Sequence, residues 1–141
     1  MKNWTVRLRQ ANANQRANKT ELLPLPQPIR DVLSLEYHLQ LEALKAGAGS
    51  LMALQTLMRV AMANWMLGEL GYENSASHAV GDYQAAVNDA FSAGDEGTYA
   101  FSGEAVKRFA TLLTEHDAQL KLAPVRVLDQ VAKRLERSSW H

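Results

Sequence analysis

Residues 50–71, SLMALQTLMRVAMANWMLGELG, decide the fold, because apolar side chains occupy almost every helical position of this stretch. The narrow polar strip that interrupts them consists of Gln55, Thr56 and Arg59. A helix that is apolar on nearly every side belongs in the middle of a bundle. Ser50 is a favourable N-cap for it. At the other end, Gly71 predicts a Schellman ending in which Tyr72 folds back onto Leu67.

Helical periodicity and capping residues predict further helices on both sides of this one. They run from Pro28 to near Gly47, from Asn74 or Ser75 to Gly94, from Ser102 onward, and from Pro124 to Arg137. The first of them carries its apolar side chains at Ile29, Val32, Leu33, Leu35, Leu39, Leu41 and Leu44. Pro124 either kinks one helix or starts another, since proline is tolerated in a first turn. The sequence therefore predicts an all-α fold, a single bundle of four to five helices over residues 29–141.

Two segments precede this bundle. Residues 1–23 are predicted to form an extended N-terminal arm, because their many Asn and Gln side chains favour local hydrogen bonds over a long helix. Within the arm, Trp4, Val6 and Leu8 alternate with polar residues, as in a short half-buried strand. Such a strand either lies on the body of the molecule or pairs with another molecule. Residues 24–28 carry three prolines at alternate positions and are predicted to be a semi-rigid spacer.

Charge is distributed unevenly along the chain, although its formal net charge is zero. Residues 1–30 carry six bases and one acid, and residues 121–141 carry five bases and two acids. The body between them, residues 31–120, carries four bases and twelve acids, a net charge of −8. Such asymmetry often marks interaction surfaces. The alternative is that both basic ends fold back on the acidic body and neutralise it.

Several kinds of chemistry are disfavoured by the composition. The chain has no cysteine, which excludes thiolate nucleophiles, disulfides and cysteine-ligated metals. The nearest approach to a metal site combines His78 and Asp82 with residues 115–117, but a di-iron bundle needs a Glu-x-x-His pattern on each of two helices. No serine lies in a nucleophile-elbow motif. We therefore expect no catalytic residue, no metal and no cofactor, and a protein that is not an enzyme.

The remaining class is a protein-binding module. Large apolar and basic side chains at the two ends of the chain are the candidate contacts, because Trp and Arg are enriched at binding hot spots. The candidate partner-binding residues are Trp4, Val6, Arg7, Leu8, Arg9, Arg134, Arg137 and Trp140. The alternative is a DNA-associated regulator that uses the basic arm and the basic last helix. The acidic body argues against direct nucleic-acid binding, since it would repel phosphates.

Location and assembly are expected from weaker features. The N-terminus lacks the apolar core of a signal peptide, and no stretch is long and apolar enough for a membrane span, so we expect a cytoplasmic protein without membrane contact. A homo-oligomer is compatible with the sequence.

Two motifs carry a resemblance. Residues 41–47, LEALKAG, and 116–120, HDAQL, together with the Met/Ala/Trp-rich helix that ends at Gly71, resemble a loose set of small helical proteins. These proteins are carried by plasmids, integrative elements and phages of proteobacteria. The resemblance covers about two thirds of the chain and leaves out the arm and the spacer. It implies an accessory protein of a mobile element that acts on a host or defence complex, such as an inhibitor of the anti-CRISPR kind, and an acidic body that mimics nucleic acid would suit a partner that handles nucleic acids.

Overall fold

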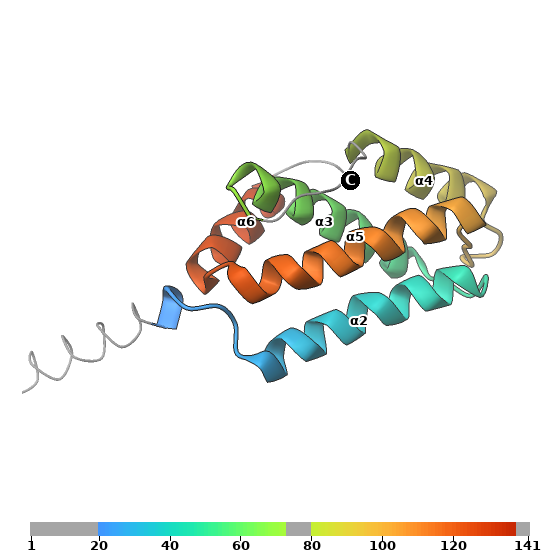
Figure 1. Ribbon diagram of the computed structural model, residues 1–141. Coiled ribbons are helices and arrows are strands. Elements are labelled where there is room, and N and C mark those ends of the chain that lie inside the picture. Colours follow the sequence, from blue (N-terminus) through green and yellow to red (C-terminus); the bar gives the residue numbers. More distant parts are fainter. Residues whose placement is uncertain (1–19, 73–79, 138–141) are drawn as a thin grey trace, which may run out of the picture.

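The computed structural model describes residues 20–72 and 80–137, and these residues form an all-α bundle, as predicted. Its helices are α2 (Gln27–Lys45), α3 (Leu51–Glu69), α4 (Val80–Ala93), α5 (Gly103–Leu122) and α6 (Val125–Arg137) (Figure 1). In the described ranges β-type backbone pairing is limited to isolated bridges, and no strand forms. None of the described helices is both long and apolar enough to cross a bilayer.

Helix α3 is the central helix, because it contacts α2, α4, α5 and α6. The prediction from residues 50–71 is therefore confirmed. The Ser50 hydroxyl accepts a hydrogen bond from the Ala53 N–H at 3.1 Å. At the other end, Gly71 has a φ of 94° and the Tyr72 N–H donates to the Leu67 carbonyl at 3.0 Å, which is the predicted Schellman ending.

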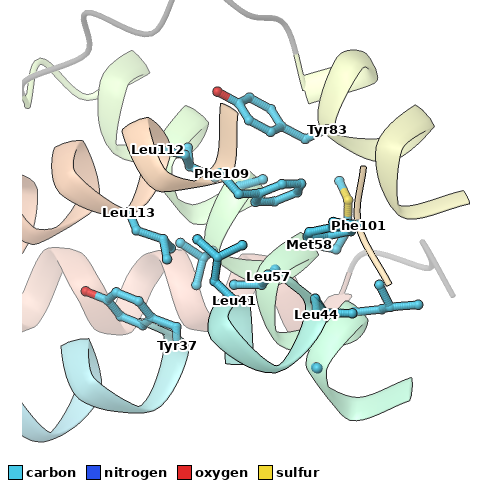
Figure 2. Close-up of a cluster of buried hydrophobic side chains, with 14 of the residues drawn as sticks. Tyr37, Leu41, Leu44, Leu57, Met58, Tyr83, Phe101, Phe109, Leu112 and Leu113 are labelled. Carbon is cyan, nitrogen blue, oxygen red and sulfur yellow. The ribbon is translucent and has the colours of Figure 1, made fainter. Parts of the chain in front are cut away.

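The aromatic part of the core forms around Phe109 of α5, which is fully buried. Its ring stacks on Phe101 with centroids 4.9 Å apart and meets Tyr83 of α4 edge-on at 5.1 Å (Figure 2). Leu41 and Leu44 of α2 bring that helix into the same cluster. The core thus joins α2, α3, α4 and α5 around one group of rings and aliphatic side chains.

A tight turn connects α4 to α5. Asp95 and Thr98 exchange two backbone hydrogen bonds, and the two residues between them have positive φ angles, 53° at Glu96 and 75° at Gly97. Tyr99 then exchanges two backbone hydrogen bonds with Gly49, which ties this turn to the connection between α2 and α3. The chain next enters α5, and the Ser102 hydroxyl accepts from the Ala105 N–H at 3.1 Å as the predicted N-cap.

Prolines lie at the starts of both α2 and α6. Pro124 starts a new helix rather than kinking one, since α5 ends at Leu122 and α6 begins at Val125. The Val125 N–H donates to the Leu23 carbonyl at 2.9 Å, so the segment before α2 is held against the start of α6. Helix α2 begins at Gln27, so the last two residues of the predicted spacer 24–28 lie in its first turn. Residues 1–19 of the predicted arm lie outside the described residues.

Candidate functional site

Helix α2 is apolar on two opposite sides. Its inner side is buried through Tyr37, Leu41 and Leu44. Its outer side presents Val32, Leu35 and Leu39, which are 66%, 60% and 56% exposed. At 100° per residue these three positions form one row along the helix, about half a turn away from the buried side. We call this row the α2 face. In Figure 1, α2 lies at the lower edge of the bundle with the other described helices on one side of it.

The charged residues nearest the α2 face are all carboxylates. Asp31 and Glu42 lie along one edge of the row and Glu36 along the other, and all three are exposed. None of the ion pairs among the described residues involves any of them. The α2 face is therefore an aliphatic row with carboxylates on both edges that form no ion pair among the described residues.

A groove lies between α2 and α3, on the far side of Glu36 from the α2 face. It has a volume of about 380 Å³ and is mostly apolar, and its lining includes Leu33, Val60, Ala63, Leu120 and Leu135, with Glu36 and Arg59 among its polar residues. Leu33 is 37% exposed and borders the groove from the α2 side. The groove is a second apolar surface, which runs from the inner side of α2 toward the end of α6.

A buried polar network links α3 to α5 near this groove. The Gln119 Oε1 atom accepts from the Asn64 Nδ2 at 3.1 Å and lies 3.0 Å from the His116 Nδ1. The Gln119 Nε2 donates to the Asn64 carbonyl at 3.0 Å. Because an amide oxygen only accepts, His116 carries its proton on Nδ1. Burial lowers the pKa of His116, although the Gln119 hydrogen bond opposes this, so the imidazole is neutral at physiological pH.

A second cluster fastens α2 to α5. The Tyr37 hydroxyl donates to Asp117 Oδ1 at 2.5 Å, and His38 Nε2 lies 2.9 Å from Asp117 Oδ2. Burial raises the pKa of Asp117, but hydrogen bonds from Tyr37 and from two neighbouring α2 side chains outweigh it and hold the pKa below its usual range. Burial and the hydrogen bond to Asp117 raise the pKa of Tyr37 well above its usual value. Both groups therefore keep the protonation states that form the bond.

Among the described residues, neither cluster assembles the ligands of a metal site. The neighbouring residues His116 and Asp117 have different polar partners, since the His116 Nδ1 pairs with Gln119 and the Asp117 carboxylate pairs with Tyr37 and His38. The described part of the chain contains no group of three or more His, Asp or Glu side chains that could hold a metal. His78, the other half of the metal arrangement considered from the sequence, lies outside the described residues.

The structure describes two of the candidate contacts predicted from the sequence. Arg134 of α6 lies 3.5 Å from the Glu69 carboxylate, and its guanidinium carbon is 5.8 Å from the centroid of the Trp65 ring. It therefore helps to hold α6 on α3. Arg137 is exposed at the end of α6. The other six candidates, Trp4, Val6, Arg7, Leu8, Arg9 and Trp140, lie outside the described residues.

The α2 face is not among the candidate sites predicted from the sequence, although the sequence contains its signal. Val32, Leu35 and Leu39 are predicted only as apolar positions of the first helix. Placed on a helical wheel, the apolar positions of α2 fall on two opposite sides, which a helix on the edge of a bundle does not need for its core. The chain matches no protein-family model, no curated protein and no solved structure.

Proposed function

We propose that this chain is a non-enzymatic protein-binding module and that its α2 face is the docking surface. The observation that carries the proposal is the row formed by Val32, Leu35 and Leu39, all more than half exposed. Their spacing, i, i+3 and i+7, is the one through which helices pair in coiled coils and helix-in-groove complexes. Single exposed aliphatic side chains are ordinary on protein surfaces, whereas a contiguous row marks an interaction site.

Burial of this row contributes part of the free energy of a specific contact. Full burial of one Val or Leu side chain contributes roughly 1.5–3 kcal/mol. Part of the gain from three such side chains is offset by the entropy lost on association. The groove beside Leu33 offers further apolar surface to the same partner. A partner with an apolar row and basic neighbours fits best, because Asp31, Glu36 and Glu42 border the face.

The biological setting belongs to the same proposal. The resemblance to small accessory proteins of mobile elements supports a partner in a host or defence complex, including one that handles nucleic acids. The described residues carry ten bases and fourteen acids, so their net charge is −4. A negative body favours a protein that itself binds nucleic acid over nucleic acid as the direct ligand.

A matched pair of variants tests the docking surface. Leu35→Gln with Leu39→Gln removes most of the row, and Gln keeps the helix propensity of Leu. Leu122→Gln is the control, because Leu122 is 57% exposed on α5, away from the row. The tagged full-length chain is purified from its native host, and the co-purified proteins are quantified. We expect a partner that the control retains and the double variant loses. Equal recovery with both variants would refute the assignment of the α2 face.

The alternative, a DNA-associated regulator, has a direct test. Arg126, Lys133 and Arg137 lie along one side of α6, but Lys133 already pairs with Asp129 at 2.9 Å. If duplex DNA is the ligand, affinity falls with salt at a log–log slope of about −0.9 per phosphate neutralised. We expect no shift with random duplex in a gel-shift assay at moderate salt. Tight, salt-sensitive binding there would favour the alternative.

A further inference from the structure

The α2 face of an isolated chain leaves three large aliphatic side chains in water. Burial of these side chains against another surface is favourable. Among the described helices, α2 contacts α3 and α5, and both contacts lie on its buried side. A surface that buries the α2 face therefore belongs to another part of the chain, to a second copy or to another protein.

A second copy of α2 is a poor cover. Two such helices that pair through their rows place the residues at the edges of the rows next to each other. The edges carry Asp31, Glu36 and Glu42, so a parallel or an antiparallel pair brings carboxylates together. Like charges at these positions are destabilising, which favours a basic partner over a copy.

The N-terminal segment of the chain has the complementary chemistry. Residues 1–19 contain five bases and no acid. They also contain the alternating apolar side chains Trp4, Val6 and Leu8. This is the combination that an aliphatic row bordered by carboxylates would select, because apolar burial and charge pairing then act at the same place.

The segment is also long enough and starts at the right place. The described chain begins at Thr20, seven positions before Gln27, the first residue of α2. Figure 1 shows these connecting residues leading to the amino end of α2. An extended chain spans at most about 3.3–3.6 Å per residue, so the sixteen steps from Trp4 to Thr20 cover at most roughly 53–58 Å. Helix α2, with 19 residues, is only about 28 Å long.

We propose that residues 1–19 dock on the α2 face of their own chain, with Trp4, Val6 and Leu8 against the aliphatic row and their basic neighbours against its carboxylate edges. This inference rests on the proposed function in one respect: a protein that binds the α2 face must displace the segment. The segment then acts as a built-in competitor that sets the threshold for partner binding.

The absence of cysteine from the chain makes a direct test clean. Thr5→Cys, between Trp4 and Val6, supplies a single thiol for a nitroxide spin label in the full-length, isotope-labelled protein. We expect the amide signals around Val32, Leu35 and Leu39 to lose most of their intensity relative to the reduced label, while signals of α4 keep theirs. Undiminished signals along α2 would overturn the proposal.

Two further samples identify the cause of the effect. The signal loss should largely disappear in the Leu35→Gln, Leu39→Gln variant and persist in Leu122→Gln. Equal losses in both variants would overturn docking on the row. In a mixture of spin-labelled chains with separate isotope-labelled chains, signal loss would show that the segment comes from a second copy and would overturn docking within one chain.

The outcome is separable from that of the proposed function. Signal loss along α2 in a protein whose co-purified proteins do not depend on the row supports the docked segment and refutes the binding role. Loss of a partner on mutation of the row, without any signal loss from the spin label, refutes the docked segment and leaves the binding role in place.

Discussion

Replacement of Gln119 by leucine is expected to destabilise the bundle by roughly 2–6 kcal/mol. Gln119 is fully buried, and its Oε1 atom is the shared acceptor for the Asn64 Nδ2 and the His116 Nδ1. Leucine fills similar space but accepts no hydrogen bond, so two buried donors lose their partner. Each unsatisfied buried donor costs about 1–3 kcal/mol, which gives the stated range. Small domains have only about 5–15 kcal/mol of stability in total.

The assay is urea unfolding of the full-length chain followed by far-ultraviolet circular dichroism. The double variant Asn64→Leu, Gln119→Leu removes one of the two orphaned donors together with the acceptor. The double variant should therefore lose less free energy of unfolding than the two single variants lose together. The expected coupling energy between the two positions is about 0.5–3 kcal/mol. A loss below about 1 kcal/mol for Gln119→Leu, a size usual for a surface change, would refute the network, as would strict additivity.

Three further predictions concern pH and packing. Burial lowers the pKa of His116, so as pH decreases below about 6.5 the unfolded chain takes up a proton before the folded chain does. The free energy of unfolding should therefore decrease as pH decreases in this range. In urea titrations, His116→Leu should flatten this part of the pH profile. Hydrogen bonds hold the pKa of Asp117 below its ordinary value of 3.8. The ionised carboxylate therefore stabilises the fold above pH 3.8, and this stabilisation is lost as pH decreases through the lower pKa of the folded state. Asp117→Asn should remove this acid-sensitive component of thermal melts. An alanine methyl at Gly94 would lie 2.2 Å from the Tyr99 ring and should cost about 1–3 kcal/mol in calorimetry, whereas Gly81→Ala on α4 meets open space and should be neutral or stabilising by up to about 1 kcal/mol.

The borders of most helices were predictable because local chemistry sets them. Ser50 and Ser102 supply hydroxyl acceptors to N–H groups three residues ahead, and Gly71 takes the positive φ that a Schellman ending needs. Pro124 has no N–H and starts a new helix at the position that the sequence left open. Each of these effects depends on residues within one turn of the border.

The clusters between helices were not predictable because their partners are far apart in the sequence. Gln119 meets Asn64 across 55 residues, and Tyr37 meets Asp117 across 80. Asn64 lies outside the polar strip of its helix and is the one available signal of a buried polar partner, since buried amides are almost always hydrogen-bonded. The sequence gives no means to select Gln119 among the polar residues of the other helices.

The exposure of the α2 face follows from how the chain turns after α5. Pro124 ends the preceding helix, and α6 then packs on α3, where Arg134 reaches Glu69 and Trp65. Had α6 packed on the outer side of α2 instead, its aliphatic side chains would have covered Val32, Leu35 and Leu39. The inner side of α2 is fixed by Leu41, Leu44 and the Tyr37 bond to Asp117, so the outer row is presented on a helix that is already held in place. A preorganised row loses little entropy when it is covered, and this favours both proposed occupants, the N-terminal segment and a protein partner.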